Sequence, residues 1–145
     1  MPTQTNVKRL NCYMDYILHA LLRVDSPIVE KVTVELSVQK LRAIYFLGKN
    51  SKSIQRELAD YLGVSVSNTS IMVEALVKKH LVERHRTDED RRIVKISLTK
   101  EGQIIYRLML DHHLRLCEQI LQPLSLEEQK TLLSIFDKAV MGLHG

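Results

Sequence analysis

The feature that most constrains the fold is a pair of short helical patterns followed by a change of period. The first pattern spans residues 54–62 and stops at Gly63, and the second begins after Ser65, a good helix N-cap. The second pattern has an apolar side made of Thr69, Met72, Val73, Leu76 and Val77. Two short helices joined by Gly-Val-Ser predict a helix-turn-helix.

The period then changes from helical spacing to strict alternation. Val94, Ile96 and Leu98 alternate with polar Lys95 and Ser97, which is typical of a half-buried strand. Residues 81–86 are a suitable partner strand, and residues 87–91 would form the hairpin tip. A hairpin directly after a helix-turn-helix predicts a wing.

Longer helical patterns flank this centre. They cover residues 7–24, 38–47, 99–122 and 126–143. Ser37 can cap the helix at 38–47, and Gly48 suits the C-terminal exit of that helix. Ser125 begins an S-x-x-E capping box for the helix at 126–143. The first, fifth and sixth helices have more apolar surface than the centre can cover, which predicts packing against a second copy. A two-fold dimer would place its two recognition helices about one DNA turn apart.

The predicted fold is therefore mainly α with a small β-hairpin wing. We expect one domain over residues 1–145, with a winged helix-turn-helix lobe at 37–99 and dimerisation helices within 1–36 and 100–145. No apolar run approaches the ~18 residues of a membrane helix, and the N-terminus lacks the pattern of a signal peptide. These features favour a cytoplasmic protein with no membrane partner.

The charge distribution favours a polyanionic partner. The chain carries a formal net charge of +4, and residues 78–100 hold eight Lys or Arg against four Asp or Glu. Residues 101–145 hold four basic against six acidic residues, so the positive field is concentrated around the predicted wing.

The order of elements and the motifs resemble the MarR (multiple antibiotic resistance regulator) family of winged-helix transcription factors. The most specific motif is Asp90-Arg91-Arg92 followed by ISLTKEG at 96–102, which is similar to the family's D-x-R wing tip and the L-T-x-x-G start of its long helix. The resemblance implies a homodimeric regulator, commonly a repressor, that binds a pseudopalindromic operator in double-stranded DNA. Recognition helices would enter the major groove and wing arginines the minor groove. A small ligand, an oxidant or a metal releases many members from DNA.

Two positions depart from the family's pattern. His80 stands in VKKHL where members usually carry glycine, at a position expected to be left-handed. Ile71 stands where a polar or basic side chain often faces the groove, although an apolar side chain could contact thymine methyl groups.

The candidate DNA-binding residues form two sets. The recognition-helix set is Ser65, Ser67, Asn68, Ser70, Ile71 and Lys78, and the wing set is Arg84, Arg86, Asp90, Arg91 and Arg92. We expect Asp90 to accept from the guanidinium of Arg92 and fix its direction, while Asp88 and Glu89 form a solvated turn. The alternatives are capping alone for Ser65 and ordinary solvated charges for the arginines.

Other residues invite different chemistry. An effector pocket could be lined by Tyr13, Tyr16 and Tyr45, although aromatic residues at helical spacing could belong to the core. Cys12 could sense oxidants, or it could be a structural thiol. His112, His113 and Cys117 suggest a metal, but packing is the favoured interpretation, and we predict no metal site and no cofactor. An enzyme, such as a hydrolase using His112 or His113, lacks any supporting motif. A winged-helix module for protein contacts is the remaining alternative.

Overall fold

The computed structural model describes residues 1–23, 36–87, 89–90 and 92–144 of the chain. In chain order the elements are α1 (Gln4–Leu22), α3 (Val38–Lys49), β1 (Ser53–Ile54), α4 (Gln55–Leu62), α5 (Val66–Lys78), β2 (Val82–Arg86), β3 (Val94–Leu98), α6 (Lys100–Leu121) and α7 (Leu126–Leu143). The chain divides into a winged-helix unit, residues 22–111, and a terminal-helix unit, residues 1–21 with 112–145. The predicted fold class, mainly helical with a β-hairpin wing, is confirmed.

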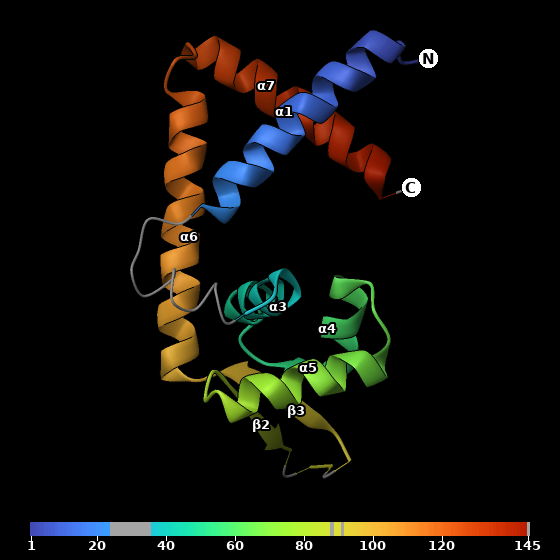
Figure 1. The fold of residues 1–145 in the computed structure, drawn as a ribbon, viewed down its shortest axis with the longest axis vertical. Helices are drawn as coiled ribbons and strands as arrows, with labels where there is room; N and C mark the ends of the chain where they lie inside the picture. Colours follow the sequence, from blue (N-terminus) through green and yellow to red (C-terminus); the bar gives the residue numbers. More distant parts are fainter. Residues whose placement is uncertain (24–35, 88, 91, 145) are drawn as a thin grey trace. The chain divides into compact units, whose positions relative to one another are not determined.

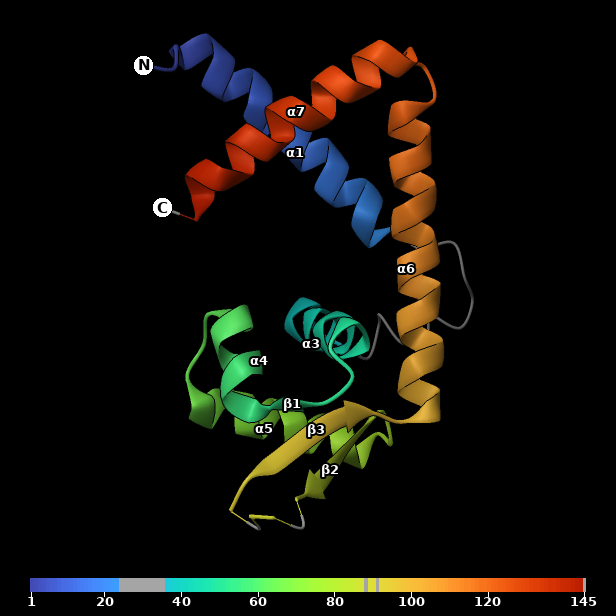
Figure 2. The ribbon, with the colours of Figure 1, turned by 180° about the vertical axis from the view of Figure 1, so that it is seen from behind.

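The winged-helix unit has a continuous apolar core. In Figures 1 and 2, α3, α4 and α5 lie together, and the tip of the β2–β3 hairpin extends away from them. Its fully buried side chains come from each of these helices and from β3: Ile44, Leu47, Leu58, Val73, Leu76 and Ile96. Each such side chain contributes roughly 1.5–3 kcal/mol by leaving water, so the core fixes the positions of α5 and the hairpin.

The predicted turn between α4 and α5 is confirmed. Gly63 ends α4 in the left-handed region, at φ 68° and ψ 31°, where glycine has no Cβ clash. The Ser65 hydroxyl then accepts from the backbone N–H of Asn68 at 3.1 Å and caps α5. Thr69 is completely buried and donates its hydroxyl to the Ser65 carbonyl at 2.9 Å.

The hairpin is confirmed, but the sheet contains a strand that the sequence did not indicate. Strands β2 and β3 are antiparallel, with Val82 opposite Leu98 and Arg86 opposite Val94. The additional strand β1 pairs with the other edge of β3, giving the order β1-β3-β2. It has only two residues, so it shows no alternation from which it could have been predicted.

A compact junction joins the end of α5 to the start of α6. His80 adopts φ 60°, as expected, and its carbonyl accepts from the Thr99 hydroxyl at 2.6 Å. The Thr99 side chain also accepts from the Gly102 N–H at 3.1 Å, which caps α6. A Cβ on Gly102 would overlap the carbonyl oxygen of Leu81. Gly102 is therefore needed because two backbone segments meet there.

The prediction for Gly48 was wrong. Helix α3 continues to Lys49 and is capped at Asn50, so Gly48 lies inside the helix rather than at its exit. A Cβ on Gly48 would overlap the ring of Tyr106 in α6. Its missing side chain therefore serves close helix packing, which local sequence does not reveal.

The terminal-helix unit leaves much apolar surface exposed. The capping box at the start of α7 is confirmed, since Ser125 and Glu128 each accept from the other's backbone N–H, at 3.1 and 3.0 Å. Helix α1 begins at Gln4, three residues before the predicted start, because Thr3 caps it by accepting from the Asn6 N–H. Within their described ranges, neither α1 nor α7 buries any residue. Among the described residues, no helix is long and apolar enough to cross a membrane.

Candidate nucleic-acid interface

One face of α5 carries exposed side chains, both polar and apolar, that a ligand could contact. Ser67, Asn68 and Ile71 are exposed, and Ile71 is the most exposed large hydrophobic residue of this helix at 71%. Ser70 is half-buried, and Lys78 is exposed in the last turn. The Ser65 hydroxyl is occupied by capping, which is the alternative noted for that residue. The short polar side chains near the helix start remain suited to phosphates and base edges.

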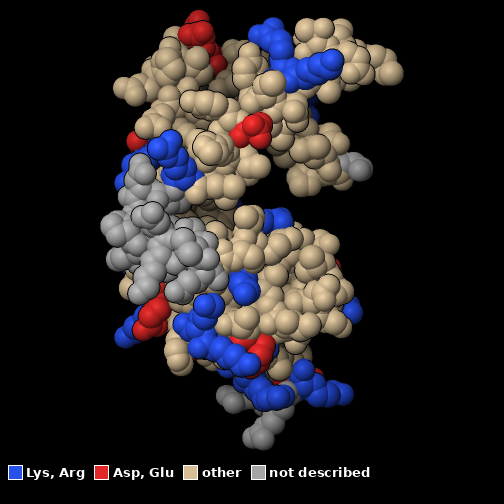
Figure 3. Space-filling model, viewed as in Figure 1, with Lys and Arg blue, Asp and Glu red and all other residues tan. Residues whose placement is uncertain are grey.

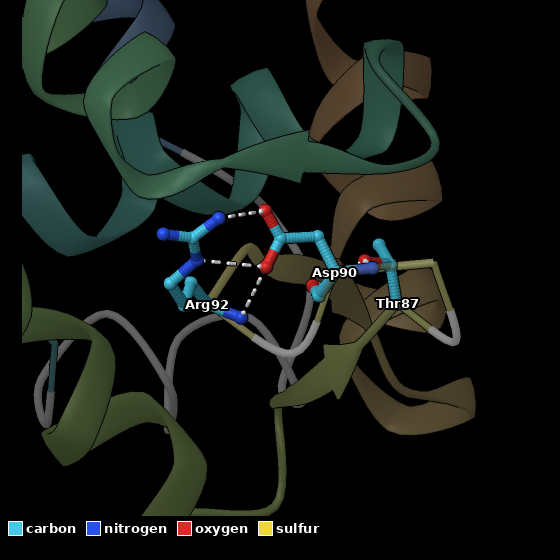
Figure 4. Close-up of polar contacts among 3 residues, drawn as sticks. All are labelled: Thr87, Asp90 and Arg92. Atoms are coloured by element: carbon cyan, nitrogen blue, oxygen red, sulfur yellow. Dashed lines mark hydrogen bonds and ion pairs between the residues drawn. The ribbon is translucent and has the colours of Figure 1, made fainter.

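Hydrogen bonds within the tip of the hairpin order the segment before Arg92. The Thr87 side chain donates to the Asp90 carbonyl and accepts from the Asp90 N–H at 3.1 Å (Figure 4). The chain then turns back, because the Ile93 N–H donates to the same Asp90 carbonyl at 3.1 Å. These contacts place the Asp90 carboxylate beside Arg92.

Asp90 holds both the backbone and the side chain of Arg92. Its Oδ1 accepts from the Arg92 backbone N–H at 3.0 Å and from Nε at 3.1 Å, and Oδ2 lies 3.4 Å from Nη2 (Figure 4). These hydrogen bonds lower the pKa of the Asp90 carboxyl. The Arg92 side chain is nevertheless 91% exposed. The predicted Asp90–Arg92 pairing is thus confirmed: an exposed guanidinium with a fixed direction, which loses less entropy on binding than a free one.

The other wing residues have different surroundings. Arg84 bonds to Glu74 of α5, with Nη1 and Oε2 2.6 Å apart, and Arg86 is exposed at the end of β2. Glu89 is exposed in the bend before Asp90. Arg91 and Asp88 lie outside the described residues, so their predictions stay as they were. On the face drawn in Figure 3, Lys and Arg side chains gather at the hairpin end of the winged-helix unit.

Sequence reasoning did not identify Glu74. A signal was present, because Ser67, Ile71, Glu74 and Lys78 follow one another at steps of four, three and four residues, which places them on one face of a helix. This spacing places a carboxylate on the recognition helix, but it does not show which side chain that carboxylate contacts.

The three tyrosines considered for an effector pocket belong to separate units. Tyr13 and Tyr16 are exposed on α1, and the Tyr13 hydroxyl accepts from Arg9 at 3.1 Å. Tyr45 is half-buried in the winged-helix unit, where its ring centroid lies 5.7 Å from that of Tyr106. Nothing in either environment tests an effector pocket, which stays a prediction.

The remaining candidates, two histidines and two cysteines, have different surroundings. His112 Nε2 donates to the Ala20 carbonyl at 2.8 Å and thereby ties α6 to the end of α1. Burial, followed by the neighbouring His112, lowers the pKa of His113. Cys12 and Cys117 are exposed free thiols. Over the described ranges, no group of three or more His, Cys, Asp or Glu side chains could hold a metal ion.

A three-helix core carrying a helix-turn-helix and a basic hairpin defines a winged helix-turn-helix protein. A sequence profile of the MarR family matches residues 35–93. An HTH-type transcriptional regulator of Bacillus subtilis, YfiV, is 30% identical over 115 residues, which cover 77% of this chain and 71% of that protein. The chain therefore belongs to the MarR family of transcriptional regulators, and its relatives are regulators rather than enzymes.

Other comparisons agree over longer spans. The transcriptional repressor MprA of Escherichia coli is 27% identical over 139 residues, covering 90% of this chain and 79% of that protein. The crystal structure of Streptococcus pneumoniae FabT in complex with DNA matches with a TM-score of 0.73 and 26% identity, covering 95% of this chain and 94% of that one. The likeness thus includes the helices on both sides of the segment matched by the profile.

Proposed function

We propose that this protein is a homodimeric repressor that binds a pseudopalindromic operator in double-stranded DNA. The observation that carries the proposal is Arg92, an exposed guanidinium that Asp90 orients at the tip of a basic hairpin. Support comes from the similar proteins, since FabT has been crystallised with DNA and MprA is a repressor. The similar proteins come from bacteria, where the DNA lies in the cytoplasm, so the proposal places this protein there.

The two elements would make different contacts with DNA. Helix α5 would enter the major groove, with Ser67, Asn68 and Ser70 reaching base edges and phosphates and Ile71 contacting thymine methyl groups. Arg92 would enter the adjacent minor groove, where Arg91 would assist it. Phosphate contacts would come from Ser65, Lys78, Arg84 and Arg86.

The proposed dimer rests on the apolar faces of the terminal-helix unit. The exposed large apolar side chains of α1 and α7 are Val7, Leu10, Tyr13, Met14, Tyr16, Leu18, Leu22, Leu126, Leu133, Ile135, Phe136, Val140, Met141 and Leu143. A single chain rarely leaves so many large apolar side chains of two helices in water. A second copy is the occupant that this family membership favours, and residues 1–36 and 100–145 are the proposed dimerisation segments, around a winged helix-turn-helix lobe at 37–99.

A charge placed on α7 tests the dimer. Phe136→Asp should shift the protein from dimer to monomer in sedimentation velocity, because Phe136 is 51% exposed in the single chain and would be covered in the dimer. Val66→Asp is a matched control, since Val66 is 46% exposed at the start of α5, in the winged helix-turn-helix lobe outside the proposed dimerisation segments. A dimeric Phe136→Asp variant would contradict this interface.

The proposal includes relief of repression by a small ligand or an oxidant. Cys12 is exposed on α1, so peroxide could reach it in the single chain, and Tyr13, Tyr16 and Tyr45 remain the candidate pocket residues. Selection of bound sequences from a random duplex pool, repeated with peroxide and with aromatic acids, tests DNA binding and effector response together. Recovery of the same sequences with equal yield under every condition would remove the effector proposal while keeping the DNA proposal.

Arg92 provides the direct test of DNA binding. On a duplex recovered from the pool, Arg92→Ala should weaken binding and flatten its salt dependence, because each positive charge removed from the DNA surface releases fewer counterions and lowers the slope by about 0.9. Arg107→Ala is the control, since this exposed arginine lies on α6, away from the hairpin. An unchanged slope for Arg92→Ala would contradict the wing assignment. Weak, sequence-indifferent binding by the unaltered protein would instead favour a module for protein contacts.

A further inference from the structure

An ion pair joins the recognition helix to the wing hairpin. Arg84 of β2 and Glu74 of α5 approach to 2.6 Å between Nη1 and Oε2, which is closer than the 3.1 Å between Asp90 and Arg92. Both side chains are partly exposed, at 32% for Arg84 and 50% for Glu74. The hydrogen bond from Arg84, followed by its positive charge, lowers the pKa of Glu74, so the carboxylate is charged at neutral pH.

Glu74 occupies an unexpected place for an acid. It lies on the same helical face as Ser67, Ile71 and Lys78, the face that the proposed function directs towards DNA. A carboxylate there would repel phosphates if it were unpaired. Its presence is explained if it acts on another side chain rather than on DNA, and Arg84 is the side chain that it contacts.

Arg84 lies where the two proposed DNA-binding elements meet. It is opposite Ile96 in the hairpin, with its side chain reaching across to the middle of α5. A helix in the major groove and a wing in the adjacent minor groove straddle the phosphate backbone that separates the grooves. A guanidinium carries five N–H donors, and Glu74 accepts from Nη1, so others can donate to a phosphate at this point.

We propose that Glu74 is a positioning residue, which holds Arg84 towards the phosphate backbone between the two grooves and sets the spacing of recognition helix and wing. The inference rests on the proposed function and adds a residue to that site. The predicted change in DNA affinity is opposite to the change expected from net charge alone. Removing the negative charge of Glu74 should weaken DNA binding, although it makes the surface more positive.

The test compares Glu74→Gln with Glu83→Gln. Glu83 neighbours Arg84 in β2, its side chain is 53% exposed, and it contacts His85 rather than an arginine, at 3.3 Å. Both variants remove one acid of similar exposure close to the hairpin. Binding is measured by salt titration on the duplex recovered from the random pool and on an unrelated duplex. Thermal melts at one chain concentration confirm that each variant is folded.

We expect Glu74→Gln to bind the recovered duplex roughly three- to tenfold more weakly than the unaltered protein, a size typical of a charge-assisted surface pair. Glu83→Gln should bind equally or slightly more tightly. The same comparison is then made in an Arg84→Met background, which keeps an apolar stem but no charge. There Glu74→Gln should tighten binding, because the carboxylate no longer has a guanidinium to hold.

Three results would overturn the inference. Glu74→Gln could tighten binding as much as Glu83→Gln, it could have no effect, or it could have the same effect with and without Arg84. Each of these would leave the proposed function intact, provided that the unaltered protein binds the recovered duplex with salt dependence. If the unaltered protein shows no such binding, both the proposed function and this inference fail.

Discussion

Replacing His80 by glycine should stabilise the protein. His80 is the residue after the helix cap of α5, where its N–H donates to Val77 O and the next N–H, of Leu81, donates to Leu76 O, both at 3.0 Å. This pattern is a Schellman motif, which places a residue in the left-handed region, and His80 adopts φ 60° there. A Cβ at such a position costs about 1–2 kcal/mol.

Two opposing effects set the size of the gain. Glycine removes the Cβ strain but has more freedom in the unfolded chain, which costs roughly 0.5–1 kcal/mol. The His80 side chain is exposed, so its loss removes little packing, and the bond from the Thr99 hydroxyl goes to the backbone carbonyl and is kept. We expect a net gain of about 0.5–1 kcal/mol in the free energy of unfolding, or about 2–3 °C in Tm for a chain of this size.

Denaturant unfolding at one chain concentration measures this gain, because the stability of a dimer depends on concentration. Lys79→Gly is the matched control. Lys79 is the neighbouring exposed residue, but its φ is −83°, so glycine relieves no strain there and should destabilise the protein. Equal destabilisation by both glycines would refute the reasoning, since it would show that the left-handed backbone at His80 carries no strain.

Three further outcomes can be checked. Asp90→Asn should weaken operator binding by roughly threefold in a gel shift at neutral pH. Because Arg92 lowers the pKa of Asp90, the carboxylate stabilises the folded state above its unfolded pKa and loses this contribution only as pH falls through the lowered value. A change in the size of the binding effect between pH 6 and 8 would therefore contradict the prediction. Gly102→Ala should lower the free energy of unfolding by about 1–3 kcal/mol, whereas Gly142→Ala, whose Cβ meets no atom within 4 Å, should raise it by up to about 1 kcal/mol. Ser125→Ala should cost about 1 kcal/mol in the same denaturant assay through the lost cap of α7.

Local chemistry explains which parts of the fold could be predicted from the sequence. Gly63, Ser65 and Ser125 each mark a helix boundary through a backbone conformation or a side-chain acceptor that acts within four residues. The hairpin followed from alternation in one strand, and the Asp90–Arg92 pair from a spacing of two residues within a turn. In all these cases the interacting groups are close in sequence, so the pattern contains the contact.

The features that were missed depend on partners distant in sequence. Strand β1 exists because β3 offers it an edge more than forty residues later, at Ile96 opposite Ser53. Gly48 is required by the ring of Tyr106, which approaches from another helix. No local pattern encodes such contacts, and Gly48 was therefore assigned the role that glycine has most often near a helix end. The carboxylate of Glu74 is a similar case, since it needs Arg84, ten residues away on a different element.

Two acids, Asp90 and Glu74, each pair with an arginine of the hairpin. Asp90 bonds to Arg92 at the tip of the hairpin, and Glu74 bonds to Arg84 at the middle of β2. Each acid cancels one positive charge, which lowers non-specific attraction to any polyanion, yet each also fixes a guanidinium that would otherwise sample many directions. If geometry matters more than total charge, neutralising either acid should weaken binding to the operator more than binding to an unrelated duplex. A protein that bound DNA by net charge alone would respond in the opposite way, gaining affinity for both duplexes.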